Sequence, residues 1–302
     1  MKINIPSGVA DSPHRNNLFE EHFLQAWLYT HSDQLPFDTS AFKEQWLKQI
    51  SLNQDQNECA EKLFENWPMN LTKPIFIKGH ALEKLGLYQI GERFKSDIDL
   101  LIDQESLHYL ENRIKALNGH EIKEKKWWGN SHKKIFSLSQ NNHEVVIECH
   151  SQLFYHLPQI DWQRYRHTQI SDQLQLEAHL LFLMGHYVFQ HNCLKIYWLL
   201  DIALFIEKFS KQIDWNKLQH LAREWDLKVS LDWSLSLANE LANFNLEIPK
   251  GMIKSNLDID FNFAWQTKQS GLRYWKMKHK AKGKIANSLK YDVKWLLNKT
   301  RK

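Results

Sequence analysis

Glycine and proline are scarce in this chain, with ten Gly and seven Pro among 302 residues. Such a composition excludes a loop-rich or collagen-like scaffold. By contrast, thirteen Trp and sixteen Phe are typical of large aromatic side chains packed between helices. With 43% hydrophobic and 25% charged residues, the chain has the composition of a globular protein. Its length suits one large domain or two smaller ones.

Cysteine is equally scarce, and its positions exclude two common uses. Cys59, Cys149 and Cys193 are far apart, odd in number and without Cys-x-x-Cys spacing. This spacing indicates neither a disulfide framework nor a thiolate zinc site, and it favours a reducing compartment. The sequence also lacks a run of about 18 apolar residues, which a membrane span requires, and a signal segment at its start. We therefore expect a cytoplasmic protein without a transmembrane segment.

Positive charge is concentrated at one end of the chain. Residues 265–302 hold twelve Lys or Arg and one acid, Asp292, so this segment carries +11 while the whole chain carries +4. The remaining residues therefore carry −7. Trp265, Tyr274, Trp275, Tyr291 and Trp295 are interleaved with the cations. This pattern occurs in nucleic-acid grooves, in helices on membrane surfaces and in solvated helix faces, and the composition does not decide among them.

Hydrophobic periodicity divides the chain into helical and strand-like regions. A helical period runs through 17–67 and returns from Leu174 onward. Between them lie four short apolar runs with the character of strands, separated by a helix at 80–87 and another near 107–117. The four runs are 74–78, 98–102, 135–138 and 145–149.

These patterns predict an α+β fold, with a small mixed β-sheet, flanking helices and an all-helical C-terminal half. We expect N-terminal helices in 1–69, an α/β core in 70–152, a helical domain in 153–264 and a basic aromatic tail in 265–302.

Two acids on one expected strand suggest a metal site. Asp97 and Asp99 are two residues apart, so their side chains share one face while Ile98 enters the core. Glu148 lies on the polar face of a later strand, and it completes a set of three carboxylates if the two strands are neighbours. Such a set suits two Mg²⁺ or Mn²⁺ ions. His150, on the same face as Glu148, is either a hydrogen-bonding partner of these ligands or a surface histidine.

Residues upstream of the acids suggest a place for phosphate. Lys78, Gly79 and His80 lie between an expected strand and an expected helix, where a glycine lets phosphate approach the backbone. Arg93 and Lys95 precede the acidic pair and offer charge-assisted contacts to phosphate oxygens. Alternatively, Lys78 and Arg93 are solvated charges.

Together these residues resemble the polymerase-β-like nucleotidyltransferase superfamily, and more closely the bacterial family called uncharacterised nucleotidyltransferases. The superfamily commonly has serine or glycine where this chain has His80. The resemblance covers roughly residues 60–250. The matching positions are Lys78-Gly79, Arg93, Ser96 to Ile102, Ile147 to His150, His186, His191, Leu200-Asp201 and Asp214-Trp215.

The resemblance implies transfer of a nucleoside monophosphate from a nucleoside triphosphate, with ATP the expected substrate, and release of pyrophosphate. Asp97, Asp99 and Glu148 would be catalytic residues and ligands to two Mg²⁺ or Mn²⁺ ions. The nucleotide would contact Lys78, Gly79, His80, Arg93, Lys95 and Ser96. The acceptor could be a small molecule, a saccharide, a protein or RNA.

Two other functions are compatible with the sequence. One is an inactive nucleotide-sensing or nucleic-acid-binding module that contacts a polyanion through its basic tail. The other is a nucleotide-sugar glycosyltransferase, which fits less well because only one strand and one helix precede the acidic pair.

His186 and His191 are expected to be packed histidines, while Asp201 and Asp214 are expected to serve as a buried hydrogen-bonding group and a helix cap.

Overall fold

The structure of the protein is a computed structural model. It describes residues 1–123, 133–141, 143–154, 157, 159–170, 172–253, 261–265, 271–283, 288–289 and 292–293. The chain divides into two compact units. Unit 1 comprises Met1–Phe42 and Leu176–Val293, and unit 2 comprises Lys43–Gln175 and Lys294–Lys302.

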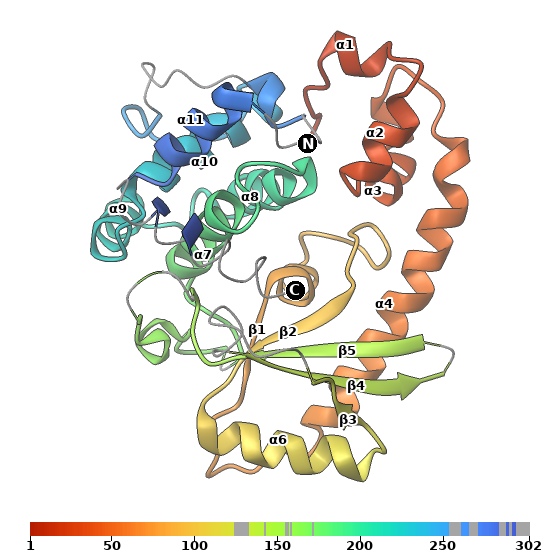
Figure 1. Cartoon of the computed structure of the whole chain (residues 1–302), viewed down its shortest axis with the longest axis vertical. Coiled ribbons are helices and arrows are strands. Elements are labelled where there is room, and N and C mark those ends of the chain that lie inside the picture. Colours follow the sequence, from red (N-terminus) through yellow and green to blue (C-terminus); the bar gives the residue numbers. More distant parts are fainter. Residues whose placement is uncertain are drawn as a thin grey trace. The chain divides into compact units, whose positions relative to one another are not determined.

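Unit 2 is built on a five-stranded sheet in the order β1-β2-β5-β4-β3 (Figure 1). β2 and β5 are parallel, whereas the other neighbours are antiparallel, so the sheet is mixed as predicted. The two-residue β3 was not predicted. The strands are β1 (Ile75–Ile77), β2 (Asp97–Leu101), β3 (His120–Glu121), β4 (Lys133–Gln140) and β5 (His143–His150).

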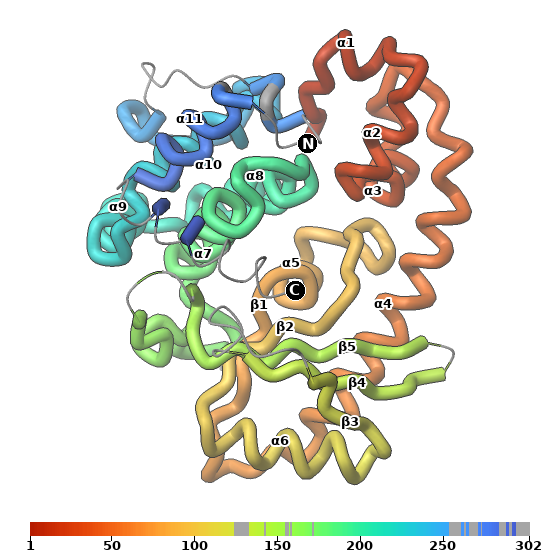
Figure 2. The backbone as a smooth tube through the Cα atoms, viewed as in Figure 1, coloured from red at the N-terminus to blue at the C-terminus, as the bar shows by residue number. Residues whose placement is uncertain are grey.

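Among the described residues of unit 2, three α-helices accompany the sheet, namely α4 (Lys43–Phe64), α5 (Lys78–Lys84) and α6 (Gln104–Ala116). The chain passes from β1 directly into α5 and then returns along β2 (Figure 2). Asp103 caps α6 by accepting a hydrogen bond from the Ser106 backbone N–H at 2.9 Å. Apolar side chains of α4 and α6 pack on one face of the sheet, around Ile98 and Ile147. This packing leaves the opposite face of β2 and β5 for polar side chains.

Unit 1 is helical. Asp214 caps α9 as predicted, because its Oδ1 accepts the backbone N–H groups of Asn216 and Lys217 at 3.0 Å. Asp201 is fully buried. The principal helices are α1 (Ser7–Ala10), α2 (Arg15–Glu21), α3 (Gln25–Thr30), α7 (Leu176–Phe189), α8 (Ile196–Phe209), α9 (Trp215–Glu224), α10 (Lys228–Leu241) and α11 (Gly271–Ala281). Among the residues that the structure describes, no helix combines the length and the hydropathy needed to cross a membrane.

The first part of the basic segment is integrated into unit 1. Trp265 and Tyr274 are buried, and the Trp265 carbonyl oxygen lies 3.0 Å from Nε2 of His22. Lys282 is also buried and donates to Oδ1 of Asn192 at 2.8 Å. Trp275, in contrast, is half exposed. The contacts of Trp265 and Tyr274 place these two residues in the helical core of unit 1. The predicted aromatic positions 291 and 295 fall outside the described residues.

Candidate active site

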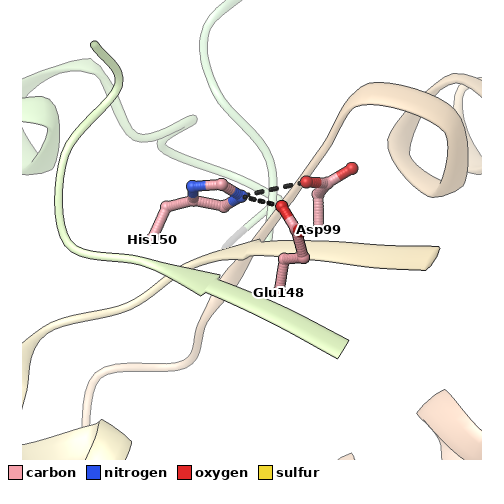
Figure 3. A group of neighbouring side chains, drawn as sticks. All are labelled: Asp99, Glu148 and His150. Carbon is pink, nitrogen blue, oxygen red and sulfur yellow. Dashed lines mark hydrogen bonds and ion pairs between the residues drawn. The ribbon is translucent and has the colours of Figure 1, made fainter. Parts of the chain in front are cut away.

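The alternation of side chains along β2 and β5 brings acids from two strands together. Ile98 and Leu100 are fully buried in the core, which directs Asp99 to the opposite face of β2. In the parallel pairing of β2 with β5, Asp99 is directly opposite Glu148. Figure 3 shows both carboxylates on the same side of the sheet, with the His150 ring beside them.

Asp99, Glu148 and His150 form a compact group of metal-ligating atoms. One ligand atom from each residue lies within 4.8 Å of the other two. His150 Nε2 is 2.9 Å from Asp99 Oδ1 and 3.5 Å from Glu148 Oε2 (Figure 3). Asp99 is 3% exposed and His150 is 8% exposed, so the group is largely shielded from water. The predicted partner His150 therefore lies among the candidate ligands themselves.

Asp97 occupies the same face of β2, one strand repeat before Asp99. It is opposite Val146 instead of an acid, and it is not a member of the compact group. Burial and then the Asp99 carboxylate raise the pKa of Asp97 to about 7, although Lys78 opposes the change. Asp97 is therefore partly protonated near neutral pH, and a cation placed beside it would favour loss of that proton.

Two lysines neutralise the compact group. Lys78 Nζ lies 2.6 Å from Asp99 Oδ1, and Lys133 Nζ lies 2.9 Å from Glu148 Oε1. Burial by itself would raise the pKa values of Asp99 and Glu148, but Lys78 and His150 hold both below their ordinary values. Lys78 also has a left-handed backbone with φ of 54° at the start of α5. Lys133 is not among the site residues predicted from the sequence.

Gly79 leaves room for two basic side chains. A Cβ atom at this position would lie 2.4 Å from Arg93 Nη1 and 2.7 Å from Lys95 Cγ, which is closer than van der Waals contact permits. Lys95 Nζ pairs with Glu83 Oε2 at 2.5 Å and is almost completely buried. In this structure Lys95 is thus engaged inside the protein, while Ser96 is exposed. The space beside Gly79 holds the Arg93 guanidinium.

His80 does not project its bulk toward the acids. Its ring lies against Phe76, with the ring centroids 4.3 Å apart, and Phe76 belongs to the core on the opposite face of the sheet. Burial and then Lys95 hold the pKa of His80 well below its ordinary value, so the ring is neutral at pH 7. A histidine after Gly79 is therefore accommodated by core packing.

The downstream histidines belong to unit 1 and pack together. The rings of His186 and His191 have centroids 4.6 Å apart, and both contact Trp198. His186 is buried in α7. These contacts support the packing role expected for the two histidines.

The chain matches the model of a known protein family. A family model described as "Uncharacterised nucleotidyltransferase" matches residues 13–243, which include the whole sheet and the compact group. No curated protein and no solved structure matches the chain.

Proposed function

The chain belongs to the uncharacterised nucleotidyltransferase family, and from this premise we propose that unit 2 transfers a nucleoside monophosphate from ATP to an acceptor hydroxyl, with release of pyrophosphate. The observation that carries the proposal is the compact group of Asp99, Glu148 and His150 on adjacent parallel strands. A shielded group of acids beside basic residues is the arrangement that phosphoryl chemistry needs.

The donor set fits a divalent ion. Two carboxylates and one imidazole within 4.8 Å of one another suit Mn²⁺, and Mg²⁺ where water completes the shell. Asp99, Glu148 and His150 would hold one ion, and Asp97 would supply a further carboxylate toward a second. Such ions, when bound, make an acceptor hydroxyl more acidic and neutralise charge on the triphosphate.

The remaining polar residues have distinct tasks in this proposal. Lys133 fixes Oε1 of Glu148, and Oε2, on the His150 side, would accept the proton of the acceptor hydroxyl. Lys78 balances the charge of Asp99 and would bind a phosphate oxygen of the nucleotide. Arg93, beside Gly79, would contact the phosphates as well. Lys95 would act indirectly, because its pair with Glu83 keeps α5 and Arg93 in place.

A labelling experiment tests the proposal. The full chain would be incubated with each of four labelled nucleoside triphosphates, Mg²⁺ or Mn²⁺ and a cell extract, followed by pyrophosphate measurement and mass spectrometry of labelled products. We expect pyrophosphate release together with a nucleotidylated product. Asp99→Asn should abolish both, whereas the exposed Asp161→Asn should leave both unchanged.

The same experiment separates the alternative functions. Binding of triphosphate without pyrophosphate release from any of the four nucleotides would contradict the proposal and identify an inactive nucleotide-binding module. The glycosyltransferase alternative would require activity with a nucleotide sugar. It lacks structural support because β1 and α5 are the regular elements between α4 and β2.

A further inference from the structure

Unit 1 contains a cavity of about 790 Å³ beside α10 and α11. Its walls include Val229, Trp233, Trp275 and Leu289, and most of the surface area of the lining is apolar. The volume falls within the range of small-molecule sites in proteins. All residues of the proposed nucleotide site lie in unit 2, and this cavity therefore has no assigned role in the transfer reaction.

The charged residues around the cavity are mainly cationic. Lys228, Lys276 and Lys280 line it together with the acid Asp226. Lys228 pairs with Asp232, so its charge is balanced locally. Lys276 and Lys280 are exposed, lie four residues apart on α11 and thus share one face of that helix. An anionic group at this face would gain favourable electrostatic energy.

A buried lysine lies next to one of the lining residues. Lys282 is 1% exposed and adjoins Gly283, which also lines the cavity. Burial and then repulsion from Lys278 lower the pKa of Lys282 to about 7. Lys282 is therefore only partly charged near neutral pH, and an anion bound nearby would favour its protonated form.

Apolar side chains are exposed on the same segment. The exposed fraction is 66% for Leu272, 50% for Trp275 and 46% for Leu289. A cluster of exposed apolar side chains in a folded protein usually marks a binding surface. The cavity thus combines apolar walls with the exposed lysines Lys276 and Lys280.

We propose that this cavity binds a single-chain anionic amphiphile, such as a fatty acid or an alkyl phosphate. Its apolar body would lie between Val229, Trp233 and Trp275, and its head group would lie at Lys276 and Lys280. A nucleic acid fits less well, because, of the exposed apolar side chains Leu272, Trp275 and Leu289, only Trp275 offers a face on which a base could stack. An amphiphile would thus be a ligand of the basic segment, and its binding would not depend on nucleotidyl transfer.

A displacement assay with the full chain tests the proposal. 1-Anilinonaphthalene-8-sulfonate would serve as the fluorescent probe, displaced by monomeric laurate or by dodecylammonium, which has the same chain length and the opposite charge. We expect laurate to bind at least about tenfold more tightly, because the head group meets cations. Lys276→Glu combined with Lys280→Glu should raise the Kd for laurate about tenfold or more. Lys211→Glu, an exposed charge reversal elsewhere in unit 1, should leave it unchanged.

A second variant separates cavity binding from surface binding. Val229→Trp should fill the cavity and abolish laurate binding. If Val229→Trp does not fold, Trp275→Ala, at a half-exposed position, should weaken laurate binding because it removes an apolar wall of the cavity. Near-ultraviolet circular dichroism would establish that each variant is folded. Equal binding of laurate and dodecylammonium would overturn the proposal. So would binding to anionic vesicles or RNA without binding of monomeric laurate.

Discussion

Replacing Lys78 by methionine should change the affinities for metal and for nucleotide in opposite directions. The Lys78 ammonium lies 2.6 Å from Asp99 Oδ1, where it neutralises a candidate metal ligand. Removing this positive charge leaves His150 as the remaining partner of this oxygen and removes repulsion of a divalent ion. We expect Mn²⁺ to bind about tenfold more tightly, a gain of about 1.4 kcal/mol. A triphosphate loses one charge-assisted contact of about 1.5–3 kcal/mol and should bind about tenfold or more weakly.

The change should also cost some stability. Two unit charges about 4 Å apart interact by about 4 kcal/mol at an effective dielectric constant near 20, before the cost of removing both charges from water is subtracted. Because His150 continues to hydrogen-bond Asp99, we expect the free energy of unfolding to fall by about 1–3 kcal/mol. Lys78→Gly should recover about 1 kcal/mol of that loss, since glycine adopts the left-handed backbone of φ 54° without strain.

The two affinities can be measured without turnover. Free Mn²⁺ would be followed by electron paramagnetic resonance, and a non-hydrolysable triphosphate analogue by isothermal titration calorimetry. Lys133→Met is the matched control, because Lys133 pairs with Glu148 at 2.9 Å and has no proposed phosphate contact. It should raise Mn²⁺ affinity and leave nucleotide affinity unchanged. Unchanged or weaker Mn²⁺ binding by Lys78→Met would refute this reasoning.

Three further predictions follow from the buried groups. Asp99→Asn should abolish pyrophosphate release. Because Lys78 loses its buried partner, the free energy of unfolding measured by urea titration should fall by about 3 kcal/mol. Full activity of this variant would contradict the prediction. Gly79→Ala should lower the free energy of unfolding by about 1–3 kcal/mol in the same titration, because the new Cβ displaces Arg93. It should also weaken binding of the triphosphate analogue in calorimetry. Wild-type values of both quantities would contradict the prediction. Burial lowers the pKa of His22 from 6.5 to about 4. The neutral ring therefore stabilises unit 1 fully above pH 6.5. As the pH falls from 6.5 to 4, the free energy of unfolding should decrease by up to about 3 kcal/mol. Urea titrations across this range should show a shallower loss for His22→Gln, and an equal loss in both proteins would refute the assignment.

The acids of the candidate site could be predicted because their signal is local. Side chains alternate along a strand, so the spacing of Asp97 and Asp99 and the position of Glu148 among apolar residues define their faces. The pairing of β2 with β5 is a tertiary property that no local pattern contains. It places Asp99 opposite Glu148 and leaves Asp97 opposite Val146, so His150 lies nearer the centre of the group than Asp97 does.

The basic residues were harder to predict because long side chains can reach several partners. No sequence pattern distinguishes the pairing of Lys95 with Glu83 from a contact with phosphate. Lys133 could have been found from the turn between β4 and β5. A pairing of Gln140 with His143 fixes the hairpin register and brings Lys133 opposite His150. The two-residue β3 is too short to leave a periodic signal.

The discontinuity of unit 1 has a consequence for synthesis on the ribosome. Residues 43–175 of unit 2 emerge as one continuous stretch, whereas Met1–Phe42 must wait for the segment that begins at Leu176. His22 in particular acquires its bond to the Trp265 carbonyl only after 243 further residues have been added. We therefore expect the sheet to form first during translation, while the amino-terminal helices remain accessible to chaperones and proteases until the chain is almost complete.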